Sequence, residues 1–424
     1  MLGLFFMNIL NVTPFYFPCG RGGERHVQEV SERLVARGHQ VTVLTTNVTN
    51  EQEYLLGLDC TLPAVEVING VRVIRVPARA GASASIINWC WRMKRGRRLL
   101  RSLFTESGID LLRENPRNLN FFRSVLRSRV DFVTTWNWYW PPAYHVSLAR
   151  QLKKFRQIGV PFFHTADLWV QRPIYDQMIM ACDGLFVNTE HEKDFILRRL
   201  PHAKRIVVVG PGVEPQLFKQ RNGAAFRTRY SLGRNPLVGF VGHISAHKGV
   251  DKLVEAMPLV WKGCKEARLI VAGYCSNNFP QLDQVLHSFL PEERKRILIL
   301  PNFAENEKAD LYDALDVFVL PSIVESFGIA YLEAWTCGKP VIGARIGSTA
   351  SVIEEGVDGL LVDPGDPRDI ARTILELLAD PIRRHHMGQH GYTKTLEHFT
   401  WEKIVEKIEH YYKGLLTQEC RRLA

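Results

Sequence analysis

Two glutamates, Glu325 and Glu333, lie eight positions apart around a turn that should follow a buried strand. The apolar run 316–320 is typical of a parallel strand, residues 322–326 of its outgoing loop, and residues 327–337 of a helix. One carboxylate precedes the helix and the other lies about one and a half turns inside it. We therefore expect them to contact different parts of one elongated ligand, and not to form a close acid–base pair.

The start of this helix is expected to bind an anion. Ser326 is its predicted N-cap and Gly338 its predicted C-terminal stop. The backbone amides of Phe327, Gly328 and Ile329 should then point at whatever lies above the strand, with the positive end of the helix dipole behind them. This turn is therefore a predicted site for a phosphorylated ligand.

Two acidic residues at this spacing would, by themselves, equally suit a pair of solvated helix charges. Residues 321–342, however, carry the order Pro-Ser, Glu, Ser-Phe-Gly, Leu-Glu-Ala and Gly-Lys-Pro-Val-Ile. This order resembles the E-x7-E motif of the retaining glycosyltransferases of family 4. The resemblance covers nearly the whole chain, from Asn8 to Tyr412, and includes His-Phe-Thr-Trp at residues 398–401.

Length and composition indicate a soluble protein with more than one core. A chain of 424 residues suits two domains of roughly 200 residues each. Its hydrophobic content of 46% and charged content of 23% are those of globular proteins. No apolar stretch reaches the roughly 18 residues of a spanning helix, and the apolar residues 1–12 lack the basic leader of a signal peptide. The eight scattered cysteines indicate reduced thiols in a cytosolic protein.

Strand-like runs alternate with helical patterns in both halves of the chain, which predicts parallel sheets with crossover helices. The runs are 8–12, 41–45, 71–76, 132–135, 161–164, 184–188 and 206–209, and then 237–241, 268–272, 297–300, 317–320, 341–343 and 360–362. The polar stretch 220–236 marks the region of the interdomain connection. Together with the resemblance, this pattern predicts an α/β GT-B fold, with two Rossmann-like doubly wound domains facing across a cleft.

The two domains are expected to divide the substrates. Residues 1–212 would form the acceptor-binding domain and residues 213–399 the domain that binds a nucleotide sugar donor. By resemblance, the C-terminal helix 400–424 would pack back on the first domain. Ligands of doubly wound sheets bind outside the carboxyl ends of the strands, so both substrates should lie at those edges.

The second domain offers a cation for the donor in residues 241–249, Val-Gly-His-Ile-Ser-Ala-His-Lys-Gly. Lys248 is placed to pair with a diphosphate and to stabilise charge on the leaving phosphate; a surface lysine is the alternative. At His243 most members of the family carry Arg, and histidine is charged only if its pKa stays near or above neutrality. Either part of the charge comes from elsewhere, such as His247, or the leaving group is stabilised less strongly.

In the first domain, Gly22 and Gly23 precede a helix and would let the backbone approach a ligand, unless they form only a flexible turn. His164 ends the predicted strand 161–164 and matches a histidine that, in the family, contacts the transferred sugar or the acceptor. A buried histidine with satisfied hydrogen bonds is the alternative. Asp167 would either orient His164 or cap the next helix.

The resemblance implies a role for each of these residues. The catalytic residues would be Glu325, Lys248 and His164. The donor would be bound by His243, Ser326, Phe327, Gly328, Ile329, Glu333, Gly22 and Gly23, with Glu333 holding the ribose hydroxyls. No metal or other cofactor is expected to be essential, because Lys248 and helix amides can neutralise the diphosphate.

Positive charge is concentrated in the first half, where residues 1–210 contain 28 Lys and Arg against 17 Asp and Glu, leaving 26 and 27 for residues 211–424. The basic, aromatic stretch that follows Ile87 contains Trp89, Trp91, Arg92, Lys94, Arg95, Arg97 and Arg98. This composition suits a helix at an anionic membrane surface, or equally a helix packed on the domain with a solvated arginine face. Nucleic acid is not expected as a partner, because no binding motif accompanies the charge.

The inferred reaction transfers a hexosyl group from a UDP- or GDP-linked sugar to an acceptor, with retention at the anomeric carbon. The expected acceptor is a lipid-linked saccharide, a glycolipid or a polysaccharide precursor. The protein would be cytoplasmic and peripheral on the cytoplasmic face of the membrane. The alternatives are a sugar-nucleotide epimerase, a phosphorylase, or a catalytically weak nucleotide-sugar-binding subunit. His243 and residues 347–351, which depart from the family pattern, keep this last alternative open.

Overall fold

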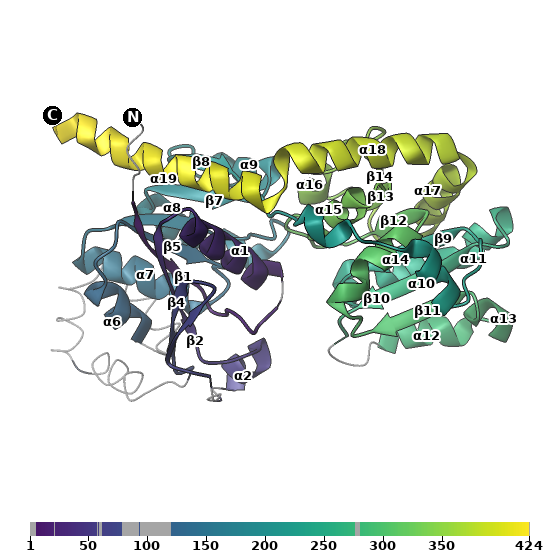
Figure 1. The fold of residues 1–424 in the computed structure, drawn as a ribbon, viewed down its shortest axis with the longest axis horizontal. Helices are drawn as coiled ribbons and strands as arrows, with labels where there is room; N and C mark the ends of the chain where they lie inside the picture. The colour runs from purple at the N-terminus through teal and green to yellow at the C-terminus, as the bar shows by residue number, and fades with distance from the viewer. Residues whose placement is uncertain are drawn as a thin grey trace. The chain divides into compact units, whose positions relative to one another are not determined.

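The computed structural model describes residues 6–20, 22–56, 58, 62–78, 93, 120–275 and 280–423. The chain divides into two compact units, the first made of residues 1–210 and 404–424 and the second of residues 211–403 (Figure 1). The division after Gly210 lies two residues before the predicted boundary at residue 212.

The first unit, among the residues described, is built on a sheet in the order β3-β4-β2-β1-β5-β6-β7-β8. Its strands are β1 (Asn8–Val12), β2 (Gln40–Thr46), β3 (Val65–Ile68), β4 (Val71–Val76), β5 (Phe132–Trp136), β6 (Arg156–Val160), β7 (Gly184–Val187) and β8 (Ile206–Val208). Only the β3–β4 pair is antiparallel, and the other neighbours run parallel. The helices that connect them are α1 (Gly22–Ala36), α2 (Glu51–Leu56), α6 (Asn120–Arg127), α7 (Pro141–Leu152), η1 (Leu168–Gln171), α8 (Pro173–Ala181) and α9 (Glu190–Arg199).

One predicted strand of this unit is wrong. The strand expected at 161–164 is β6, five residues earlier at Arg156–Val160, and 161–164 is the irregular segment after it. The buried side chains of Phe162 and Phe163 give that segment a strand-like composition, but Phe162 has a φ of +58°, which ends the extended backbone. The polar start of β6 belongs to the sheet because Asp183 accepts a hydrogen bond from the amide of Gln157 at 2.8 Å.

The second unit is built on a parallel sheet in the order β11-β10-β9-β12-β13-β14. Its strands are β9 (Leu237–Val241), β10 (Arg268–Gly273), β11 (Ile297–Pro301), β12 (Val317–Leu320), β13 (Val341–Ala344) and β14 (Gly359–Val362). Its helices are η2 (Pro215–Phe218), α10 (Gly223–Arg229), η3 (Ala246–Lys248), α11 (Val250–Gly263), α12 (Pro280–Ser288), α13 (Pro291–Arg294), η4 (Glu305–Glu307), α14 (Lys308–Ala314), α15 (Ile329–Thr336), α16 (Gly347–Ala350), α17 (Pro367–Ala379) and α18 (Pro381–His398).

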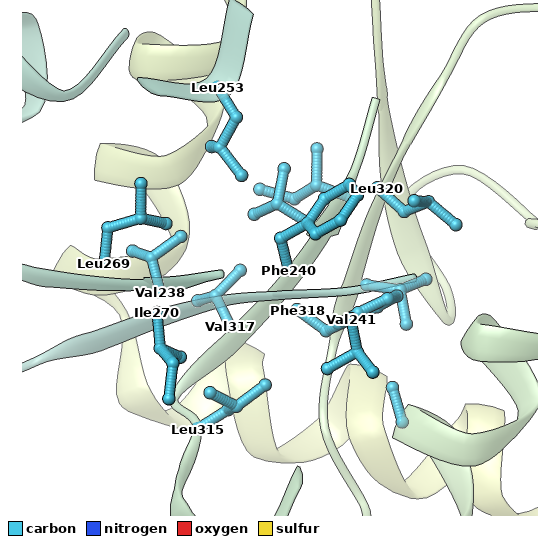
Figure 2. Packing of buried hydrophobic residues seen from close by; sticks show 14 of the residues in the cluster. Val238, Phe240, Val241, Leu253, Leu269, Ile270, Leu315, Val317, Phe318 and Leu320 are labelled. Atoms are coloured by element: carbon cyan, nitrogen blue, oxygen red, sulfur yellow. The ribbon is translucent and has the colours of Figure 1, made fainter. Parts of the chain in front are cut away.

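The core of the second unit explains its continuous apolar strands. Figure 2 shows Val238 and Phe240 of β9, Ile270 of β10 and Phe318 of β12 among the packed side chains. Each of these four residues is fully buried, because helices cover both faces of a parallel sheet. The prediction of two α/β domains with parallel-sheet cores is therefore confirmed.

The last helix, α19 (Trp401–Leu423), belongs to the first unit from Ile404 onward. The hydroxyl of Tyr412 lies 2.6 Å from that of Thr134 on β5, and its ring lies 4.5 Å from the ring of Phe132. One turn earlier, Glu409 accepts a hydrogen bond from Arg37. A segment at the far end of the sequence thus completes the core over the central strands of the first unit.

Candidate functional site

The second unit brings together two of the predicted catalytic side chains. The ammonium Nζ of Lys248, on η3 after β9, lies 2.5 Å from Oε2 of Glu325, in the loop after β12. The Lys248 side chain is 26% exposed and the Glu325 side chain 9%, so the pair is largely shielded from water. Its ion pair is therefore stronger than one at the surface, and an incoming anion would meet Lys248 where it is already held.

A close backbone approach fixes these two loops against each other. Gly249 has a φ of +68°, and a Cβ on it would lie 2.3 Å from the carbonyl oxygen of Pro321. The amide of Ile323 also donates to the carbonyl of His247 at 3.0 Å. Glycine is therefore required after Lys248, both for the left-handed conformation and for this contact.

The predicted start of the helix at 327 is wrong. Helix α15 begins at Ile329, and its N-cap is Gly328 with a φ of +94°, while the predicted N-cap Ser326 donates its amide to Oε1 of Glu325 at 3.2 Å. Phe327 is buried and packs edge-on against Phe399, with ring centroids 5.4 Å apart. Because the left-handed Gly328 is the N-cap, the positive end of the helix dipole lies two residues later in the sequence than predicted. The Ser326 amide lies outside the helix and is therefore available to hold Glu325.

Glu333 is buried on α15 and is held by helix α14. Its Oε2 accepts a hydrogen bond from the hydroxyl of Tyr312 at 2.8 Å, and its Oε1 lies 3.4 Å from Nζ of Lys308. Lys308 also pairs with Glu305 at 3.0 Å. Burial raises the pKa of Tyr312 well above its usual value, and the charge of Glu333 adds to this shift, so the hydroxyl remains a donor.

Tyr312 and Lys308 are site residues that the sequence analysis missed. They lie four positions apart on a short helix that precedes the strand leading to Glu325. A tyrosine and a lysine one helical turn apart face the same side, which was the available signal. Nothing local, however, pointed to Glu333 as their common partner.

His243 is exposed at the end of β9, and its ring lies 5.5 Å from that of Tyr274, which follows β10. His247, the other histidine considered for the donor phosphate, is also exposed, and its backbone carbonyl holds the loop that leads to Glu325. Both imidazoles are accessible to a ligand. The role of His243 stays a prediction.

In the first unit, the two glycines lie at the start of α1. Gly22 is exposed and is the first residue of the helix. A Cβ on Gly23 would meet the ring of Phe162 at 3.5 Å, an ordinary contact distance. The structure therefore shows no steric need for glycine at Gly23, and its predicted contact with the donor stays a prediction.

His164 lies in the irregular segment after β6. Its backbone amide donates to the hydroxyl of Tyr139 at 2.6 Å, and its Nδ1 lies 3.7 Å from Oδ2 of Asp167. The side chain is 37% exposed, so His164 is not the buried histidine that was the alternative. Asp167 lies where it can orient the imidazole, as the first of its two predicted roles requires.

A buried carboxyl behind this segment was not predicted. Glu192, in the first turn of α9, is 1% exposed. Its Oε1 accepts a hydrogen bond from the amide of Phe163 at 2.9 Å, and its Oε2 from the amide of Asn188 at 2.7 Å. Burial raises the pKa of Glu192 to about 7, although the hydrogen bonds from the two backbone amides lower it. From the sequence alone, Glu192 could be recognised only as part of the N-terminal cap of α9.

The residues predicted to meet a membrane, Trp89, Trp91, Arg92, Lys94, Arg95, Arg97 and Arg98, lie outside the described residues. Within the described ranges, no helix is both long and apolar enough to cross a bilayer, and no cluster of His, Cys, Asp and Glu could hold a metal ion. One cavity of about 440 Å³ lies beside α6 at the amino ends of β1, β2 and β4. It contains none of the predicted site residues.

Comparison with known proteins gives two family matches. A model described as glycosyl transferases group 1 matches residues 226–394, and a model described as glycosyltransferase family 4 matches residues 20–217. A D-inositol 3-phosphate glycosyltransferase from Xylanimonas cellulosilytica is 28% identical over 91% of this chain and 90% of that protein. One from Stackebrandtia nassauensis is 26% identical over 90% and 84%.

Solved structures resemble the chain over nearly its whole length. Sucrose-phosphate synthase from Thermosynechococcus elongatus superposes with a TM-score of 0.74 at 22% identity, covering 97% of this chain and all of that one. Anabaena Alr3699/HepE in complex with UDP-glucose gives a TM-score of 0.69 at 16% identity, covering 96% and 100%. At these identities the likeness shows the fold alone.

Proposed function

Since this chain belongs to the family 4 glycosyltransferases and has their GT-B fold, we propose that it transfers a hexosyl group from a nucleotide diphosphate sugar with retention at the anomeric carbon. The observation that carries this proposal is the contact between Lys248 and Glu325. These residues lie 77 positions apart in the sequence, and the sequence analysis predicts a catalytic role for both.

The contact suggests how the donor would be bound. Its diphosphate would take the Lys248 ammonium as a partner, and its sugar would contact Glu325, whose carboxylate is anchored by the Ser326 amide. Glu333 would accept hydrogen bonds from the ribose hydroxyls with the oxygen that Tyr312 does not occupy. A cation fixed before the reaction stabilises the leaving diphosphate without having to reorganise.

The chemistry needs no covalent enzyme intermediate. The bond between the anomeric carbon and the phosphate oxygen breaks, and a bond from the acceptor hydroxyl oxygen forms on the same face. The acceptor proton passes to the leaving phosphate oxygen, so the products are the glycosylated acceptor and a nucleoside diphosphate. His164 would orient the acceptor or the transferred sugar, with Asp167 fixing its imidazole.

For the donor we favour a UDP-linked sugar over a GDP-linked one. Alr3699/HepE, which shares the fold, is described in complexes with UDP and with UDP-glucose. For the acceptor we propose a compound that carries a phosphate. Two relatives are named for D-inositol 3-phosphate, and a lipid-linked saccharide would carry phosphate as well. The excess of Lys and Arg in residues 1–210 suits either acceptor.

The test is a screen for thermal stabilisation by UDP, GDP, ADP and their sugar conjugates, followed by transfer assays with the nucleotide that binds. A ligand that binds only the folded state raises the melting temperature. We expect a shift with UDP or UDP-glucose, and then UDP release that depends on D-inositol 3-phosphate or on a phosphorylated lipid-linked saccharide. Binding without turnover of any donor would instead favour the non-catalytic subunit, the alternative that His243 kept open.

A further inference from the structure

Three consecutive residues around His164 are each held by a different side chain. The amide of Phe163 donates to Glu192, the amide of His164 to the hydroxyl of Tyr139, and the hydroxyl of Thr165 lies 3.0 Å from Nε2 of His191. Two of these anchors come from the first turn of α9. These three contacts hold the irregular segment that carries His164 in one position.

Of the three anchors, Glu192 has the most unfavourable effect on the stability of the fold. Its carboxyl is almost completely buried, and among the described residues no cation pairs with it. Two amide hydrogens provide its stabilisation, one for each oxygen. A buried ionisable group without a counter-charge destabilises the fold when ionised, so packing and stability alone would favour an apolar side chain here.

Capping of α9 explains only half of the arrangement. Thr189 is the N-cap and accepts a hydrogen bond from the Glu192 amide at 3.1 Å. The Asn188 amide, which donates a hydrogen bond to Glu192, lies at the same end of this helix. The bond to Phe163, 29 positions away in the sequence, contributes nothing to the helix. It fixes the segment that carries His164.

We propose that Glu192 is a positioning residue that holds residues 163–165 and thereby sets the place of the His164 imidazole. This inference rests on the role of His164 in the proposed function. A carboxylate suits the task because its two oxygens can accept from two amides at once, whereas an amide side chain has one acceptor oxygen. Loss of the carboxylate should therefore release Phe163, Asn188 or both.

The geometry also makes the anchor sensitive to pH. Above about pH 7 both oxygens of Glu192 accept hydrogen bonds, and below it one oxygen carries a proton that faces an amide N–H. The ionisable groups around this carboxyl are Tyr139, His164 and Asp167 from the loops packed on it and His191 from its own helix. Burial lowers the pKa of His191, so that ring is neutral where Glu192 titrates.

The experiment compares the full-length chain with its Glu192→Gln and Glu190→Gln variants. Glu190 is a matched control, because it lies on the same helical turn but is exposed and pairs with Lys193 at 2.9 Å. Hydrogen exchange at the Phe163 amide should be about tenfold faster in Glu192→Gln, the effect of losing one hydrogen bond to a charged group. Glu190→Gln should exchange like the wild type.

UDP release from UDP-glucose supplies a second readout. We expect kcat to fall about tenfold in Glu192→Gln, with the KM for UDP-glucose and the dissociation constant of UDP unchanged, because the two amides that Glu192 accepts from, those of Phe163 and Asn188, are not among the residues proposed to bind the donor. A rise in the donor KM as great as the fall in kcat would mean that Glu192 acts on donor binding, and would overturn the proposal. If the wild type neither binds UDP nor releases it, the proposed function fails, while the exchange rates still decide whether Glu192 holds the segment.

The unmodified protein gives a test that cannot fail through misfolding. Exchange at the Phe163 amide, corrected for the chemical rate at each pH, should become less protected as the pH falls through about 7. Protection that is constant with pH, together with unchanged exchange in Glu192→Gln, would show that Glu192 is a buried carboxyl without a positioning role.

Discussion

The two units hold the carboxylates of their candidate sites in different ways. In the second unit, cations pair with carboxylates, Lys248 with Glu325 and Lys308 with Glu333. In the first unit, the group behind His164 is a carboxyl held by two backbone amides, and no cation among the described residues pairs with it. A ligand can replace one partner of an ion pair, whereas hydrogen bonds from backbone amides fix the position of the backbone. We infer that the second unit supplies the electrostatics of the reaction and the first unit supplies the geometry.

The largest effect should come from removing the cation of the second unit. We expect Lys248→Ala to lower kcat by about 10²- to 10³-fold, because a preorganised charge no longer stabilises the leaving diphosphate. Lys252→Ala is the matched control, since Lys252 lies one turn further on and pairs with Glu255. Steady-state rates of UDP release measure both. Near-normal turnover in a folded Lys248→Ala protein would remove Lys248 from its role.

The buried carboxyl of the first unit should instead appear in the pH dependence of stability. Burial raises the pKa of Glu192 from 4.5 to about 7, so between these values the folded state binds a proton that the unfolded state lacks. Its contribution favours folding at low pH and is lost as the pH rises through 7, a change of about 3 kcal/mol.

Denaturant unfolding at about pH 5 and about pH 8 measures this change. The free energy of unfolding of the first unit should fall more between these pH values in the wild type than in Glu192→Gln. Other ionisable groups contribute equally to both proteins and cancel. Equal changes in the two proteins would mean that the carboxyl has an ordinary pKa, and the contrast between the units would be lost.

A smaller effect is expected at Glu333, where we propose that the second unit binds the ribose. Tyr312→Phe removes the hydroxyl that orients Glu333 but keeps the ring, and should weaken UDP binding about five- to tenfold, the scale of one hydrogen bond to a charged group. Calorimetric titration with UDP measures it. Tyr331→Phe is the control, because that buried hydroxyl donates to the carbonyl of Leu320. Equal affinities in all three proteins would mean that Tyr312 plays no part in donor binding.

The arrangement of the proposed donor residues could be predicted further than that of the segment around His164, for a physical reason. Lys248 and Glu325 lie in short loops between strong strand and helix patterns, so their neighbours in sequence fix where they lie. The exact helix start was missed because a left-handed glycine, Gly328, replaces the usual serine cap. Glu192 was missed because its decisive partner, Phe163, is 29 positions away, and only the fold brings them together.

The last segment of the chain belongs to the first unit, which has a consequence for synthesis. Residues 211–403 are one continuous stretch of the sequence, so the second unit can complete its core before residues 404–423 are in place. The first unit must wait for residues 404–423, because Tyr412 covers Phe132 and meets the hydroxyl of Thr134. The part made first is therefore finished last, and until then its nascent core exposes apolar surface that a chaperone would recognise.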